Sequence, residues 1–261
     1  IFNESLKAAK DFAAETGAIF IAPYDHEHVV IGQGTLGLEI LDEVPDVDTI
    51  LVPIGGGGLI SGIASAVKQK AATLGRTVRI IGVQAENAAS YPPSLAAGEP
   101  TTIEISPTIC DGISVARPGT LNFDIIKDTV DEVVTVSDDD TARALVMLLE
   151  RAKLVVEPAG AVGVAAIMAK KVKKTGKTVA ILSGGNIDPL LLQRIVGHGL
   201  AASERYLKLR VMLPDRPGQL ARTAEIVSEQ NANVVEVLHT RHGRGLQISE
   251  VELELHIETR G

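Results

Sequence analysis

Helical and strand patterns alternate along the chain, and this alternation limits the fold more than any other feature. It continues through about the first 200 residues, as in right-handed βαβ units. The run Ile50-Leu51-Val52-Pro53-Ile54 is wholly apolar, which is typical of a strand covered on both faces. We therefore predict an α/β fold, with a mainly parallel twisted sheet and helices on both faces. Strands are expected at residues 18–22, 50–54, 78–83, 132–136 and 178–182, and helices at residues 34–41, 141–153 and 159–171.

The pattern changes beyond residue 205. An alternating strand at residues 206–213 is followed by a turn, a helix, and two strands at residues 234–238 and 248–257. This β-α-β-β order differs from the βαβ units of the first part. The sequence therefore predicts a first domain at residues 1–198, a short polar linker at residues 199–205 and a small α+β domain at residues 206–261.

Composition excludes several classes of function. The net charge of -8, the absence of tryptophan and the 3% of aromatic residues argue against a nucleic-acid-binding protein, which needs a basic surface and stacking side chains. No apolar run reaches the roughly 20 residues that span a bilayer, and no signal peptide is recognisable, so we expect a cytoplasmic protein without a membrane partner. The single cysteine, Cys110, can form no intrachain disulfide and should pack as a small apolar side chain. His26 and His28 lack a third ligand, so no metal site is expected and residues 23–28 should form an exposed loop.

The most informative motif is a turn of four glycines, Gly55, Gly56, Gly57 and Gly58, between the apolar strand and the next helix. Backbone without Cβ atoms can adopt positive φ angles and approach an anion, and the N-terminus of a helix favours phosphate. The alternative is a tight connection without a ligand, which one or two glycines would satisfy. The turn lacks the Lys-Ser/Thr of a Walker loop and the third glycine of a dinucleotide fingerprint. The motif therefore predicts a phosphate-bearing ligand, and neither nucleotide motif fits.

A second glycine-bearing loop, Ser183-Gly184-Gly185-Asn186, also follows an apolar strand. It precedes a helix that Asp188 is expected to cap. In a parallel sheet the carboxyl ends of strands meet at one edge, where ligands bind. One ligand could therefore contact both loops. The alternative is a capped turn in which Ser183 bonds only local backbone.

Four motifs in the same order resemble the threonine dehydratase (threonine ammonia-lyase) family of pyridoxal-phosphate enzymes. They are Gly-Gly-Gly-Gly-Leu at residues 55–59, Cys-Asp-Gly-Ile at 110–113, Lys-Leu-Val-Val-Glu-Pro-Ala-Gly-Ala at 153–161 and Ser-Gly-Gly-Asn at 183–186. Weaker segments at residues 31–35 and 115–119 fall in the expected order. The resemblance covers nearly the whole chain and implies the fold of type II pyridoxal-phosphate enzymes.

The resemblance implies that Gly55 to Gly58, with Leu59, bind the phosphate of pyridoxal 5'-phosphate, and that Ser183, with Gly184, faces its pyridine nitrogen. A neutral hydroxyl there tempers the electron withdrawal of the ring, which suits β-elimination. Asp111, Gly112 and Glu157 would line the same cleft. Their alternative readings are a turn for Asp111-Gly112 and a helix-start carboxylate for Glu157.

Relatives carry their Schiff-base lysine in a Ser-x-Lys-x-Arg-Gly segment that this sequence lacks. We therefore expect no catalytic residue in this chain, which begins at Ile1 and reads as a fragment that is inactive alone. Lys153 is expected to be a solvated or ion-paired lysine at a helix end. The family can hold a cation near residues 84–87, but few acids are present there, so weak or no metal binding is expected.

The C-terminal part resembles an ACT domain, a module that binds amino acids and regulates metabolic enzymes. The motif that carries this resemblance is Pro214-Asp215-Arg216-Pro217-Gly218-Gln219-Leu220. It implies that Asp215, Pro217, Gly218, Gln219 and Leu220 bind an amino-acid effector at the start of a helix. The alternative is a structural or dimerising module without a ligand. A homo-oligomer is expected.

These resemblances imply an enzyme that removes water and ammonia from threonine, and from serine, giving 2-oxobutanoate or pyruvate, as in isoleucine biosynthesis. One rival is a serine racemase or serine dehydratase of the same fold, against which the ACT-like tail weighs. A rival of another class is an amino-acid-sensing regulatory protein that has lost catalysis.

Overall fold

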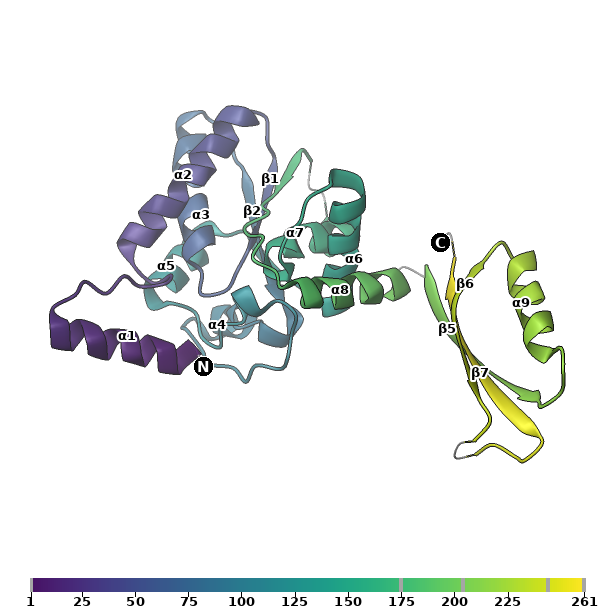
Figure 1. Ribbon diagram of the computed structural model, residues 1–261. Coiled ribbons are helices and arrows are strands. Elements are labelled where there is room, and N and C mark those ends of the chain that lie inside the picture. The colour runs from purple at the N-terminus through teal and green to yellow at the C-terminus, as the bar shows by residue number, and fades with distance from the viewer. Residues whose placement is uncertain (1, 174–175, 203–204, 243–244, 260–261) are drawn as a thin grey trace.

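The computed structural model describes residues 2–173, 176–202, 205–242 and 245–259. Its larger part contains a sheet of four parallel strands in the order β3-β2-β1-β4. Figure 1 labels the two central strands, β1 and β2. The strands are β1 (Thr49–Pro53), β2 (Arg79–Ala85), β3 (Glu132–Val136) and β4 (Thr178–Ala180). In the central register Leu51 lies opposite Ile81 on one side and Ala180 on the other. The predicted parallel sheet is therefore confirmed.

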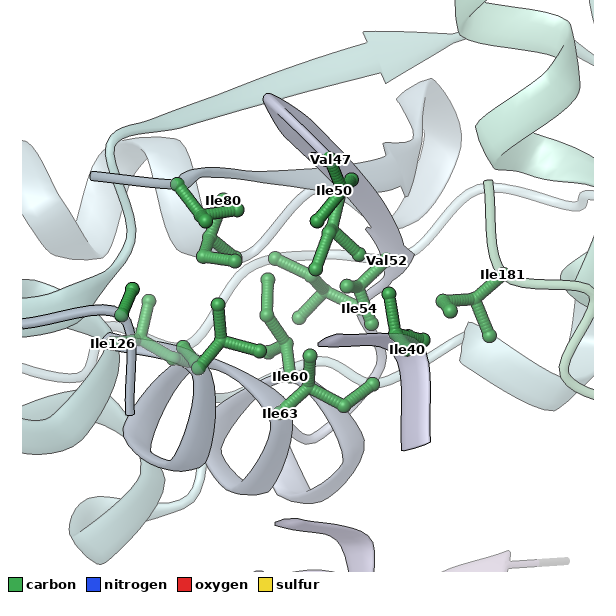
Figure 2. Close-up of a cluster of buried hydrophobic side chains, with 14 of the residues drawn as sticks. Ile40, Val47, Ile50, Val52, Ile54, Ile60, Ile63, Ile80, Ile126 and Ile181 are labelled. Carbon is green, nitrogen blue, oxygen red and sulfur yellow. The ribbon is translucent and has the colours of Figure 1, made fainter. Parts of the chain in front are cut away.

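Alternate residues of β1 enter two different hydrophobic cores. Ile50 and Val52 point to one face, where α2 (Glu27–Glu43), α3 (Gly58–Thr73) and α5 (Thr120–Thr129) cover the sheet (Figure 2). Leu51 points to the other face, which is covered by α7 (Pro158–Met168). A fully buried side chain of this size stabilises the fold by about 1.5–3 kcal/mol. Burial on both faces explains why the strand sequence is apolar without alternation.

Two further helices extend the second layer. α6 (Asp138–Met147) and α8 (Pro189–Ala202) pack with α7 around a third core that includes Leu145 and Ile195. The predicted capping box is confirmed at the start of α6, where Ser137 Oγ accepts from the Asp140 N–H and Asp140 Oδ2 accepts from the Ser137 N–H. The helix expected up to residue 153 ends earlier, in a π-helical turn at Leu148–Ala152.

The remaining helices of the larger part are short or peripheral. They are α1 (Phe2–Thr16), α4 (Tyr91–Ala97) and two 3₁₀ turns, Glu86–Ala88 and Asp111–Ile113. The helix expected at residues 34–41 is the second half of α2, which begins seven residues earlier, at Glu27.

The strand expected at residues 18–22 is wrong. This segment is irregular, and Ile19 and Ile21 are 90% and 80% exposed. A strand needs a hydrogen-bonded neighbour, and within the described residues the sheet contains none for this segment. The segment therefore has the uninterrupted apolar sequence of a buried strand but no strand to pair with in the described sheet.

The C-terminal part forms a separate antiparallel sheet in the order β5-β7-β6. Its elements are β5 (Tyr206–Pro214), α9 (Gln219–Glu229), β6 (Asn233–Thr240) and β7 (Glu250–Glu258), in the predicted β-α-β-β order. Leu253, Leu255 and Ile257 of β7 form its core with Val227 of α9. The segment expected as a linker is helical at residues 199–202, where α8 ends, and residues 203–204 lie outside the described part.

Candidate functional site

The four-glycine turn stands at the carboxyl end of β1, where α3 begins. Gly57 is the N-cap of α3 and has a φ of +101°, a conformation that favours glycine. Gly56, Gly57 and Gly58 are buried, yet within the described part of the chain no acceptor receives the N–H groups of Gly55 to Gly58. Buried N–H groups without an acceptor are rare. The turn therefore presents free donors, supported by the dipole of α3, to an anion.

The lack of side chains in this turn is required by its surroundings. A Cβ atom on Gly56 would lie 2.3 Å from the ring of Tyr24, and one on Gly57 would lie 2.1 Å from Tyr91 Oη. On Gly58 it would lie 2.9 Å from the carbonyl oxygen of Tyr24. The wall behind the turn thus excludes any larger residue, which explains why one or two glycines would not suffice.

The second glycine-bearing loop lies beside the first. β1 and β4 are parallel neighbours, so Ser183, which follows β4, emerges at the same edge as Gly55. Ser183 is exposed, and its hydroxyl has no hydrogen-bond partner among the residues that the structure covers. The helix is capped instead by Asp188, whose Oδ1 accepts from the N–H groups of Leu190 and Leu191. The alternative in which Ser183 only bonds local backbone is therefore not what the structure shows.

Asp111, Gly112 and Glu157 close the cleft between these loops. Ile113, in the 3₁₀ turn with Asp111, packs against Gly55. Glu157 is the N-cap residue of α7, but its side chain makes no cap bond; its N–H donates to the carbonyl of Gly184 at 3.0 Å. The Glu157 carboxylate lies against Gly184, where a Cβ atom would come within 2.4 Å of Oε1.

These segments enclose a cleft of about 820 Å³. It is lined by the glycine turn with Leu59, by residues 111–117, and by Glu157 and Ser183. Of the residues predicted for this cleft, Gly184 alone is outside the lining and lies behind Glu157. No lysine is part of the described lining, in which Asp111 and Glu157 are the acids and Arg117 is the base.

Sequence reasoning missed Tyr24, Asp25 and Arg117. Residues 23–28 were expected as an exposed loop, but Tyr24 and Asp25 are half-buried, and Tyr24 lines the cleft. Burial, followed by the nearby Asp25 carboxylate, raises the pKa of Tyr24, and Arg117 opposes this. Asp25 accepts from the N–H groups of Thr120 and Asn122 at the start of α5. No local pattern reveals these contacts, because the partners lie 95 and 97 residues apart in the chain.

Other residues singled out in the sequence lie away from the cleft. Lys153 is exposed, with its Nζ 2.7 Å from the carbonyl of Glu150. His26 is the N-cap of α2 and accepts from the N–H of His28. Cys110 is fully buried, as expected for a small apolar side chain. Among the described residues no group of three His, Cys, Asp or Glu side chains could hold a metal ion. None of the helices there is long and apolar enough to cross a membrane.

A second hollow, of about 410 Å³, lies in the C-terminal domain. It is lined by residues 215–220, which include every residue predicted for an effector, and by His239 and Arg241. Gly218 has a φ of +89° and is the N-cap of α9, and no atom lies within 4 Å of the position that a Cβ atom would take there. Arg241 pairs with Asp215 at 3.2 Å.

Comparison with known proteins decides the family. The family model for pyridoxal-phosphate-dependent enzymes matches residues 2–184. This chain belongs to that family. The L-threonine ammonia-lyase of Geobacter sulfurreducens is 48% identical over 261 residues, which are 100% of this chain and 64% of that relative. The chain spans about two thirds of the length of the curated relatives that it matches first, 64% in each case.

Solved structures of a threonine deaminase and a serine racemase have the same fold. A threonine deaminase of T.th. origin is 37% identical with a TM-score of 0.64, over 69% of this chain and 65% of that one. A maize serine racemase is 38% identical with a TM-score of 0.65, over 71% of this chain and 58% of that one. The expected type II fold is therefore confirmed.

The residues present fit the cofactor of a pyridoxal-phosphate enzyme. The phosphate needs several donors, and the turn from Gly55 to Gly58 offers backbone N–H groups that lack acceptors in the described chain. The pyridine nitrogen needs a polar partner, and the hydroxyl of Ser183 is available at the same edge. The cleft thus has a suitable group for each end of the cofactor.

Proposed function

We propose that the enzyme to which this sequence belongs removes water and ammonia from threonine, and from serine, giving 2-oxobutanoate and pyruvate. The observation that carries the proposal is the cleft where the glycine turn, Ser183 and Glu157 converge. The alignment with a relative named L-threonine ammonia-lyase supports it, since it extends over the whole chain, C-terminal domain included.

In this proposal each residue of the cleft has a distinct part. Gly55 to Gly58 bind the phosphate through backbone N–H groups, with Leu59 continuing the first turn of α3. When bound, pyridoxal phosphate supplies an electron sink for the α-carbon of an amino acid. Ser183, backed by Gly184, faces the ring nitrogen and leaves it unprotonated, because a neutral hydroxyl does not hold a proton there as a carboxylate would. The ring then withdraws electrons less strongly, which suits β-elimination.

Asp111, Gly112 and Glu157 form the substrate side of the cleft in this proposal. The two carboxylates give the lining a negative charge that attracts the ammonium group of an amino acid, and Gly112 leaves room beside Glu157. Since the described lining contains no lysine, we propose that this chain binds and orients cofactor and substrate. The Schiff-base lysine would come from a part of the enzyme beyond this sequence.

The test is an assay of the full-length protein with threonine and serine. We expect keto-acid formation from both and a visible absorbance from the bound cofactor. The variant Ser183→Ala should lower kcat with little change in folding, whereas Ser228→Ala, an exposed serine on α9, should match the parent. If neither amino acid yields a keto acid, the lyase proposal is wrong.

Serine racemization is the second candidate, because the serine racemase from maize matches this chain as well as the threonine deaminase does. Chiral analysis of the same reaction mixtures separates the two. D-serine as the main product from L-serine would favour the racemase. Keto acid as the main product would favour the lyase. If the cofactor binds but neither product forms, a non-catalytic amino-acid sensor becomes the better reading.

We further propose that the hollow lined by Asp215, Pro217, Gly218, Gln219 and Leu220 binds an amino-acid effector, as in an ACT domain. The free space at the N-terminus of α9 suits a carboxylate, and Asp215 suits an ammonium group. Isoleucine and valine should change the rate in the assay above, and Gly218→Val should remove the response. An unchanged rate with every amino acid would leave the domain a structural or dimerising module.

A further inference from the structure

The carbonyl oxygen of Gly56 is held by three donors. Asn122 Nδ2 and Tyr91 Oη each lie 3.1 Å from it, and the N–H of Gly119 lies 3.2 Å from it. A carbonyl oxygen has two lone pairs, so three donors saturate it. The donors come from α4, from α5 and from the residue before α5. The middle of the glycine turn is therefore fastened to the wall behind it.

This attachment fixes the direction of the next N–H group. The described chain has no cis peptide bond, so the N–H of Gly57 points opposite to the carbonyl of Gly56. With the carbonyl turned into the wall, that N–H faces the cleft. Glycine peptides can rotate at little steric cost, so the turn needs such an attachment to keep its donors in place.

Asn122 is itself held on both sides. Its N–H donates to Asp25 Oδ1 at 3.3 Å, and its carbonyl accepts from Ser61 Oγ of α3 at 3.3 Å. Its Nδ2 donates to the carbonyl of Tyr24 at 3.0 Å as well as to Gly56, while its buried Oδ1 has no partner within the described residues. An unpaired buried oxygen is costly. The amide thus contributes through its two donated bonds alone.

We propose that Asn122 and Tyr91 are positioning residues for the cofactor phosphate, which act by holding the Gly56 carbonyl so that the Gly57 N–H stays directed at the phosphate. This inference rests on the proposed function, in which the glycine turn binds that phosphate. Neither side chain is part of the lining of the cleft, so each acts through the backbone.

The test compares binding of pyridoxal phosphate with that of pyridoxal, which lacks the phosphate, by equilibrium titration. Their affinity ratio reports the phosphate contacts. Tyr91→Phe removes the hydroxyl donor, and Asn122→Leu removes both amide donors at similar volume. Thr141→Val is the matched control, because it removes a buried hydroxyl that donates to the carbonyl of Ser137, at the start of α6. We expect the ratio to fall about three- to tenfold in Tyr91→Phe and further in Asn122→Leu, and to stay at the wild-type value in Thr141→Val.

The outcomes separate this inference from the proposed function. A wild-type protein that binds pyridoxal as tightly as its phosphate would contradict phosphate binding at the turn, and with it both proposals. A wild-type preference that persists in Tyr91→Phe and Asn122→Leu would overturn the positioning role alone. If Asn122→Leu does not fold, Tyr91→Phe decides, since it leaves the ring in place.

Discussion

At the scale of residues, the chemistry of the cleft depends on groups that the backbone provides. The turn from Gly55 to Gly58 offers N–H groups, and the surrounding side chains of Tyr24, Tyr91 and Asn122 shape and hold it. Glycine is required there for two separate reasons. Gly57 has a positive φ, and at Gly56 the ring of Tyr24 occupies the place that a Cβ atom would take.

Gly57→Ala tests two constraints on this position, the positive φ and the lack of space for a Cβ atom. The alanine would hold a φ of +101°, at a strain of about 1–3 kcal/mol, and would place its Cβ 2.1 Å from Tyr91 Oη. We expect the free energy of unfolding in urea to fall by more than about 3 kcal/mol. Gly98→Ala is the control, since Gly98 has a φ of +80° with open space around it, and should cost about 1 kcal/mol. Equal losses would show that the wall does not restrict the turn.

Cys110 makes stability depend on pH in the alkaline range. Burial raises the pKa of its thiol to about 12, whereas an unfolded cysteine titrates near about 8.5. At a pH below the pKa of the unfolded chain, the thiol is protonated in both states, and its contribution to the free energy of unfolding is fully present. Above it the unfolded chain releases the proton first, so the free energy of unfolding falls as pH rises towards 12.

From pH 8 to pH 10 we expect wild type to lose roughly 1.5–2 kcal/mol more stability than Cys110→Ala, as measured by urea denaturation. Burial also raises the pKa of Tyr91, but this residue is common to both proteins, so its contribution cancels in the difference. Parallel losses in the two proteins would mean that the thiol is not protected from solvent.

At the scale of elements, the order of the strands brings the two loops together. β1 and β4 are neighbours although 124 residues lie between Pro53 and Thr178, and both loops leave the carboxyl edge of the sheet. Helix starts then define the borders of the cleft, with α3 behind the glycine turn and α7 behind Glu157.

The capping box of α6 gives a prediction for this scale. In Ser137→Ala the Asp140 N–H loses its acceptor, so the free energy of unfolding should fall by about 1 kcal/mol. Ser228→Ala, on the exposed face of α9, should stay within about 0.5 kcal/mol of wild type. Thermal and urea denaturation measure both. A loss as small in Ser137→Ala as in the control would show that water replaces the cap.

At the scale of the whole molecule, two sheets have separate cores. The cores around the parallel sheet share no residue with the core of the C-terminal sheet, and an ion pair between Glu150 and Arg205 joins the two parts at 2.7 Å. Such an exposed pair contributes little to stability. We therefore propose that the two parts unfold as separate units.

Two matched substitutions test this division. Leu51 of β1 is 0% exposed and Leu253 of β7 is 1% exposed, so replacing either with alanine should cost about 2–5 kcal/mol. Hydrogen exchange read by mass spectrometry should locate the effect. Leu253→Ala should speed exchange in β5 to β7 and leave β1 to β4 unchanged, and Leu51→Ala should do the reverse. Faster exchange in both sheets after either change would indicate one cooperative unit.

The sequence by itself determined what depends on neighbours along the chain. An uninterrupted apolar run predicted β1, and side-chain patterns predicted β3 and the C-terminal β-α-β-β order. The glycine turn indicated an anion-binding site, and Ser137 with Asp140 indicated the start of α6. These signals are local, because a strand's faces, a missing Cβ atom and a helix cap each act within a few residues.

Only the tertiary structure decided which distant residues support the turn. Asn122 and Tyr91 reach Gly56 from 66 and 35 residues away, and no periodicity announces either contact. Residues 18–22 show the converse, since their apolar pattern found no neighbouring strand in the described sheet. Hydrogen bonds between distant residues depend on how whole elements pack. That packing is set by the free-energy minimum of the entire chain. The sequence therefore identified the anion-binding turn, and the tertiary structure supplied the side chains that orient it.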